Sequence, residues 1–265
     1  MELTFEKQSF SKRLKSMIKV DLKRMFTMPL VYIMLGVCLV IPILTIVMTS
    51  MFSGMTTADP TTGVETTMEG FTNAWQAIGS TSNAGMSMDI TSMCNINLIY
   101  FIIAIFICLF VSEDFRSGYV KNLFTVRSDK RDYVISKSIV GIVGGIGMLL
   151  VYFVGAMLGG KIAGLSFEMV GFNISNIIMC LLSKAFIVAV FISIYLVLSV
   201  VGKHKVWLSI LGSFGVGMLM FMMIPMMTPL DATIMHVIMC LAGGVLFSFG
   251  LGVVSNLILK KTSLI

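Results

Sequence analysis

The chain contains six long apolar runs, and these limit the possible fold more than any other feature. A helix needs about 20 residues to cross the hydrocarbon core of a bilayer, which is about 30 Å thick. The runs lack the alternating pattern of a barrel strand. A helix is then the structure that satisfies every backbone hydrogen bond within lipid. The sequence therefore predicts an all-α integral membrane protein with six transmembrane helices. The predicted spans are about 30–52, 96–112, 138–160, 173–201, 206–227 and 234–259.

The composition excludes a water-soluble enzyme. Of the 265 residues, 57% are hydrophobic and 12% are charged, and the mean hydropathy is +0.98. A soluble domain averages about 45–50% apolar and about 25% charged residues, and so few polar groups cannot cover the surface of a soluble monomer of this size. The net charge of +6 indicates basic loops beside a lipid bilayer, and no nucleic-acid partner is expected.

Basic residues are concentrated in alternate connecting segments. Residues 1–29 hold seven, residues 113–137 hold six, and two each lie after the fourth and after the sixth run, so that 17 of the 19 fall on one side. Because such residues collect on the cytoplasmic side, both termini are predicted to be cytoplasmic. Lys184 lies inside the fourth run, where it either lines a polar transport pathway or extends toward the outer surface.

The chain divides into a basic segment, 1–29, and a six-span membrane domain, 30–265. The basic segment is predicted to form an amphipathic helix at the cytoplasmic surface. This helix either anchors in the membrane surface or acts as a lever against a cytoplasmic partner. Its apolar residues at helical spacing are Phe10, Leu14, Met17, Ile18, Leu22, Met25 and Phe26.

Two loops are too long for simple helix connections. The cytoplasmic loop 113–137 keeps an apolar and aromatic face, which predicts a short amphipathic helix that meets either lipid or a groove on another protein. The outer loop 53–95 is rich in Thr, Ser, Met and Gly, contains acidic residues and no base, and is either partly structured or disordered. The apolar face of the cytoplasmic loop comprises Phe115, Tyr119, Val120, Leu123 and Phe124.

No residue is predicted to be catalytic or to bind a metal. The segment Gly155–Ile162 approaches the nucleotide-binding pattern GxxxxGK[ST], but Ile162 replaces the hydroxyl residue and no strand precedes it. His204 and His236 are expected on opposite sides of the membrane. The 24 methionines are interpreted as flexible apolar filler rather than copper ligands, because no Cys or His clusters with them. The chain is therefore not expected to bind ATP, a metal or another cofactor itself.

A further motif lies where the second run meets the cytoplasmic loop. An acidic residue ends the run, an Arg-x-Gly sequence follows, and an Arg and a Lys enter the third run. Upstream, Lys23, Arg24 and Pro29 join the basic helix to the first run. The loop positions are Glu113, Arg116, Ser117, Gly118, Lys121, Asn122, Leu123, Arg131, Tyr133, Ser136 and Lys137.

Together with the topology, this motif resembles the ABC-2-type permeases, the membrane subunits of ABC exporters. The resemblance covers nearly the whole chain. Tyr119 stands where Thr is usual in the family, and Asp114-Phe115 is one form of a variable pair. The resemblance implies a type V exporter-like fold, a bacterial plasma membrane location, and a separate ATP-binding subunit that holds ATP and Mg²⁺. A second copy or a similar permease would complete the pathway.

The same resemblance implies roles for single residues. The helix at about 115–126 would be the coupling helix that docks on the ATP-binding subunit through Tyr119, Leu123 and Phe124. Glu113 and Arg116 would brace the second span against the loop, and Arg131 and Lys137 would anchor the return. Gly118 and Lys121 would also take part in coupling to the ATP-binding subunit. In the amino-terminal connecting helix the corresponding residues are Leu14, Ile18, Leu22 and Arg24.

By analogy with the family, the substrate is expected to be an antimicrobial peptide, such as a lantibiotic, or an amphipathic drug, in export or in immunity. Three other functions stay open. An ATP-independent carrier or channel would usually need an embedded carboxylate, and an intramembrane protease would need paired glutamates and histidines at membrane depth. The predicted spans contain neither an embedded carboxylate nor paired glutamates and histidines. A non-transporting assembly or sensor subunit is equally compatible with the sequence.

Overall fold

The computed structural model describes residues 9–58, 65–67, 70–82, 95–126, 129–203, 205–221 and 223–261. This part is nearly all helical, apart from a short antiparallel hairpin of β1 (Thr56–Ala58) and β2 (Glu65–Thr67). The α-helices are α1 (Phe10–Thr27), α2 (Pro29–Phe52), α4 (Ile99–Arg116), α5 (Tyr119–Val126), α6 (Arg131–Ile162), α7 (Ile174–Gly202), α8 (Val206–Phe221), α9 (Ile224–Met227) and α10 (Ile234–Lys261). Two 3-10 helices, η1 (Ala74–Ala77) and η3 (Ile96–Leu98), precede α4.

Five helices in the described part are long and apolar enough to cross a membrane, which supports a membrane-embedded, multi-pass protein. They are α2, α4 with η3, α6, α7 and α10. The predicted span 206–227 is not one continuous helix. Helix α8 has 16 residues, about 24 Å at 1.5 Å per residue, and α9 starts separately with Pro225 in its first turn. Proline lacks the N–H that a continuing helix requires, so the sequence pattern overestimated this helix.

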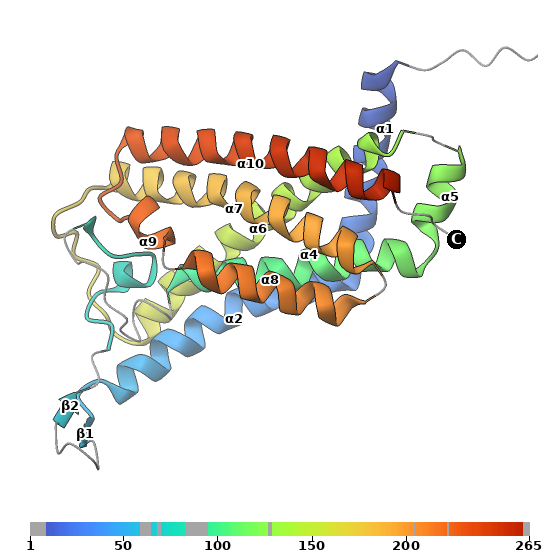
Figure 1. Ribbon diagram of the computed structural model, residues 1–265. Helices are drawn as coiled ribbons and strands as arrows, with labels where there is room; N and C mark the ends of the chain where they lie inside the picture. The colour runs from blue at the N-terminus through green and yellow to red at the C-terminus, as the bar shows by residue number, and fades with distance from the viewer. Residues whose placement is uncertain are drawn as a thin grey trace, which may run out of the picture.

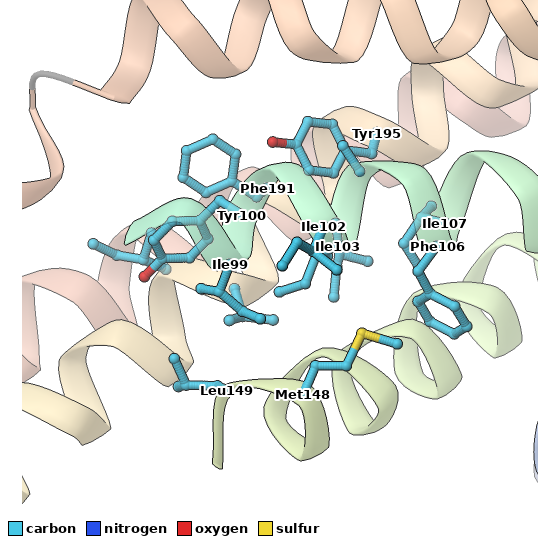
Figure 2. Close-up of a cluster of buried hydrophobic side chains, with 14 of the residues drawn as sticks. Ile99, Tyr100, Ile102, Ile103, Phe106, Ile107, Met148, Leu149, Phe191 and Tyr195 are labelled. Carbon is cyan, nitrogen blue, oxygen red and sulfur yellow. The ribbon is translucent and has the colours of Figure 1, made fainter. Parts of the chain in front are cut away.

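Helix α4 forms the centre of the bundle, and together with α7 it contributes a large share of the buried apolar side chains. Ile103 and Phe106 of α4 are fully buried, and Tyr100 stacks on Phe191 of α7 with ring centroids 4.6 Å apart. Figure 2 shows this cluster extending from α4 to Met148 of α6 and to α7. In contrast, α10 and α2 are mostly exposed on their outer sides. Their exposed apolar surfaces fit contact with lipid.

The long helices pack through small residues. Helix α7 packs along α10, and α2 packs along α6. A Cβ added at Gly155 of α6 would lie 2.6 Å from the backbone oxygen of Leu39, and one added at Gly145 would lie 2.6 Å from Val188 of α7. These glycines let α6 approach both neighbours closely. The segment Gly155–Ile162 is the last part of α6 and is helical.

One end of the bundle carries α1, α5 and the carboxyl end of α10. Helix α1 lies across this end of the bundle, and α5 projects beyond it (Figure 1). Gly118, which has a φ of +72°, makes the turn between α4 and α5, a conformation that glycine adopts without strain. The 18 residues of α1 confirm a helix in the basic segment. Its Met17 and Met25 are buried against the bundle.

The opposite end is covered by residues 70–82, which belong to the predicted loop 53–95. Trp75 donates a hydrogen bond from its indole Nε1 to the backbone oxygen of Phe167, at 3.1 Å. The backbone N–H and the hydroxyl of Ser82 both donate to the carboxylate of Asp231. This part of the loop is therefore structured and held to the α6–α7 and α9–α10 connections. The 3-10 helix η1 lies within this segment and includes Trp75.

Candidate functional site

Four ionised side chains from three helices meet at the α1 end of the bundle. Asp21 and Arg24 come from α1, Asp114 from α4, and Lys137 from α6. We refer to these four residues as the charge cluster. It holds two carboxylates and two cations, so its formal charge is balanced.

Lys137 is at the centre of the charge cluster. Its Nζ lies 2.7 Å from Oδ2 of Asp114 and 3.0 Å from Oδ1 of Asp21. Arg24 approaches the other oxygen of Asp114 at 2.9 Å. The side chains of Asp21, Asp114 and Lys137 are fully shielded from solvent, whereas that of Arg24 is 27% exposed. The arrangement therefore joins α1, α4 and α6 through ion pairs that water hardly reaches.

Neutral groups complete the surroundings of the two carboxylates. The hydroxyl of Ser136 donates to Asp21 at 2.6 Å, and the hydroxyl of Tyr133 donates to Asp114 at 3.0 Å. The ammonium group of Lys137 also lies 4.1 Å from the ring centroid of Phe110. Buried charges persist in proteins when such pairing and hydrogen bonding offset the loss of hydration.

The position of each charged residue along its helix explains why the side chains of the charge cluster meet. In α1, Met17, Asp21 and Met25 are spaced four residues apart and are all buried, so Asp21 occupies the apolar stripe that faces α6. Asp114 lies in the last turn of α4, and Lys137 lies in the second turn of α6. The turn at Gly118 and the return through α5 bring these two helix ends together.

The cluster extends to α5 through Arg24. The guanidinium carbon of Arg24 lies 4.1 Å from the ring centroid of Tyr119, a favourable cation–π geometry. Burial acts to lower the pKa of Arg24, but the nearby carboxylates of Asp114 and Asp21 outweigh it, and the pKa is raised above its ordinary value. Burial also raises the pKa of Tyr119. Arg24 therefore stays charged and Tyr119 stays neutral throughout the physiological range.

A second set of contacts lies between α1 and the start of α6. Arg13 is 3.4 Å from Asp132 and 3.5 Å from Asp129. Lys130 donates to the backbone oxygen of Leu259 at 2.6 Å, which ties the carboxyl end of α10 to the same region. Positive groups at a helix carboxyl end are favourable because they complement the helix dipole. The described parts of the segment 113–137 around Asp129–Asp132 are thus attached to α1 and α10.

The apolar face predicted for the coupling helix contacts the protein's own helices. Leu123 and Phe124 are half-buried, and Phe124 packs edge-on against Tyr133 with ring centroids 5.8 Å apart. Val120 is buried. The exposed surface of this region consists of polar residues, namely Glu113, Arg116, Ser117, Lys121, Asn122 and Thr125.

The neighbouring acidic residues Glu113 and Asp114 of α4 differ in exposure and in ion pairing. Glu113 and Arg116 are exposed and form no ion pair within the described part of the chain. Asp114, which follows Glu113 directly, pairs with α1 and α6 instead. Lys137 pairs with Asp21 and Asp114, and Arg131 lies over the ring of Phe10 at 4.9 Å.

The predicted residues of the connecting helix lie on or beside its packed face. Leu14, Ile18 and Leu22 are half-buried, and the latter two pack against the core. Arg24 belongs to the charge cluster. Sequence reasoning missed Asp21 and the pairing role of Asp114. An acidic residue between Met17 and Met25 on an otherwise apolar stripe is the signal that could have revealed Asp21.

Lys184 lies apart from the charge cluster, toward the other end of the bundle. Its side chain is fully buried, and its Nζ lies 2.8 Å from Oδ1 of Asn97 and 2.8 Å from the hydroxyl oxygen of Thr228. No carboxylate pairs with it within the described residues. Lys184 therefore holds η3, α7 and the end of α9 together through neutral acceptors.

The described residues contain no group of three or more His, Cys, Asp or Glu side chains that could hold a metal ion. Comparisons with protein-family models, with curated proteins and with solved structures found no match to this chain.

Proposed function

We propose that this chain is the membrane-spanning permease subunit of an ATP-driven exporter of the ABC-2 type. In this proposal it forms the translocation pathway with a second copy or a similar permease. It works with a separate subunit that binds ATP and Mg²⁺, and it moves an antimicrobial peptide or an amphipathic drug. The termini are cytoplasmic, the membrane is a bacterial plasma membrane, and α8 with α9 supplies the sixth crossing.

The charge cluster is the observation that carries this proposal. It connects α1, which lies across one end of the bundle, with the ends of α4 and α6 and, through Arg24 and Tyr119, with α5. A force applied to α5 or α1 would therefore reach two candidate spans through short, desolvated ion pairs. An anchor helix that only rested in the membrane surface would not need such connections.

The exposed polar surface of α5 is the proposed contact with the ATP-binding subunit. Lys121, Asn122 and Thr125 point away from the bundle's packed side, since all three are exposed. Phe124 helps to hold α5 on Tyr133. In this proposal Leu123 and Phe124 hold α5 on the bundle, and the neighbouring polar side chains meet the partner.

The test is co-expression of the full chain with a candidate ATP-binding subunit, followed by reconstitution in liposomes. The proposal expects the two to co-purify and the permease to stimulate ATP hydrolysis. Lys121→Glu should weaken both effects while the protein inserts normally. Lys161→Glu, the same change at the far end of the bundle, should leave both unchanged. Transport by the purified chain without a nucleotide-binding partner would refute the proposal.

Lys184 favours one alternative. A buried cation without a carboxylate partner is often functional in membrane proteins, and an ATP-independent carrier of anionic solutes would place one near its pathway. This carrier would act in liposomes that contain the chain alone, and its activity would be lost in Lys184→Met. The same liposome experiment therefore separates the two functions.

A further inference from the structure

A lateral groove lies between α6, α7 and α10, with a cavity volume of about 640 Å³. Its wall on α10 runs from Leu241 to Asn256, a rise of about 22 Å at 1.5 Å per residue. The wall on α6 runs from Arg131 to Ile142. One leaflet of a bilayer core is about 15 Å thick, so the groove is longer than the depth of one leaflet.

The position of the groove limits what can fill it. All three helices are candidate membrane spans, and most groove-lining side chains are apolar. Water is a poor occupant of such a space, because it would find few polar partners there. In a membrane the partly open side of the groove faces hydrocarbon. An acyl chain is the available molecule with matching shape and polarity.

The charge in the groove is confined to one end. Among the described residues that line it, Arg131 is the one charged side chain, and it lies at the α1 end with Asn256. Arg131 forms no ion pair within the described residues, and Oδ1 of Asn256 is buried without a hydrogen-bond partner there. Nearby Asp132 is paired with Arg13. A cation at the mouth of an apolar groove complements a lipid phosphate.

We propose that this groove binds one acyl chain of an anionic glycerophospholipid from the leaflet nearest α1, with the lipid phosphate at Arg131. The bound lipid fills the space between α6 and α10 and becomes part of the bundle's surface. The inference does not depend on ATP-driven transport, because it concerns lipid binding by the chain itself.

Two glycines of α10 provide a matched pair of variants. Gly252 lines the groove and Gly250 does not, and a Cβ added at either would meet nothing within 4 Å. Gly252→Phe therefore fills the groove without a clash at the Cβ, whereas Gly250→Phe adds the same side chain outside it. Thermal unfolding of both variants in detergent checks that each retains the fold.

The experiment is native mass spectrometry of the full chain in detergent. The protein is incubated with equal amounts of phosphatidylglycerol and phosphatidylcholine that carry identical acyl chains. We expect preferential retention of phosphatidylglycerol, loss of most bound lipid in Gly252→Phe, and normal retention in Gly250→Phe. Arg131→Gln should reduce the preference for phosphatidylglycerol by about fivefold, the effect of a single cation near anionic lipid. Lys121→Gln should leave the preference unchanged.

Any of four results would overturn the inference. Equal retention of the two lipids by the unmodified chain would contradict the proposed contact between the lipid phosphate and Arg131. An unchanged preference for phosphatidylglycerol in Arg131→Gln would contradict it too. Normal lipid retention in Gly252→Phe would show that the acyl chain binds elsewhere. A change in oligomeric mass in Gly252→Phe, with lipid retention unaltered, would assign the groove to a second copy of the chain.

Discussion

The ammonium group of Lys137 lies 2.7 Å from a carboxylate oxygen of Asp114, and both side chains are fully buried. This pair joins the end of α4 to the start of α6, and Asp21 extends it to α1. An ion pair in a low-dielectric interior is strong only when its charges are balanced and its hydrogen bonds are made. Charge balance is therefore the property of the site that mutation tests most directly.

Asp114→Asn is expected to destabilise the protein by about 3–5 kcal/mol, because it leaves one buried cation without compensation. Thermal or chemical unfolding in detergent measures the change. Glu113→Gln is the matched control, since Glu113 is adjacent and exposed, and its effect should stay within about 0.5 kcal/mol. The double variant Asp114→Asn/Lys137→Met restores balance and should recover much of the loss. A double variant less stable than the sum of the single ones would contradict the role of charge.

Arg24→Lys is expected to be harmful although it keeps the charge. Lysine cannot reach Asp114 and cover the ring of Tyr119 with one planar group. Tyr119→Phe keeps an aromatic face for Arg24 and should be tolerated, whereas Tyr119→Leu should cost about 0.5–2 kcal/mol. Unfolding measurements on the three variants check this order. Equal stability of the Phe and Leu variants would mean that the cation–π contact contributes nothing.

Lys184→Met is expected to leave the stability unchanged or to increase it, since it removes a buried charge that has only neutral partners. Transport should nevertheless fall, because a costly buried cation in a membrane protein is usually retained for function. Lys161→Met, an exposed lysine, serves as control for both measurements. If transport by Lys184→Met equals that of the unmodified protein, Lys184 is not part of the mechanism.

The contact between Ser82 and Asp231 is expected to weaken in acid. Burial acts to raise the pKa of Asp231, but the hydrogen bonds from Ser82 outweigh it, and the pKa lies below its ordinary value. A carboxylate whose folded pKa is lower than its unfolded value of about 3.9 stabilises the fold above that pH, and the contribution disappears as the pH falls through the folded pKa. The protection of the amides in residues 70–82 against hydrogen exchange, measured relative to the intrinsic exchange rate at each pH, should fall below about pH 4. In Asp231→Asn the exchange should be faster at neutral pH and lack this acid dependence.

Gly155→Ala is expected to separate α2 from α6 and to cost about 1–3 kcal/mol, because its Cβ would lie 2.6 Å from the backbone oxygen of Leu39. Gly147→Ala is the control on the same helix, where a Cβ meets nothing within 4 Å. This change should be neutral or stabilise the helix by about 0.5–1 kcal/mol. Similar unfolding midpoints for the two variants would show that the close approach at Gly155 carries no energetic weight.

The sequence by itself determined the helical class of this protein and the location of most of its helices. The apolar run 30–52 coincides with α2, and the run 173–201 coincides with α7. Hydrophobic length and helical spacing are local properties, so they can be read along the chain. The same reasoning located α1 and the short α5. It extended the run 206–227 too far, since the end of α8 at Phe221, ahead of the separate helix α9, is not visible in hydropathy.

Only the tertiary structure decided which charged residues are buried together. Asp21, Asp114 and Lys137 are separated by long stretches of sequence, and each occurs near other charged residues that are exposed. Glu113 and Asp114 are neighbours in the chain, yet helical rotation directs one to the surface and the other into the bundle. The pairing depends on how α1 lies across α4 and α6, which is set by packing between distant segments and not by local pattern.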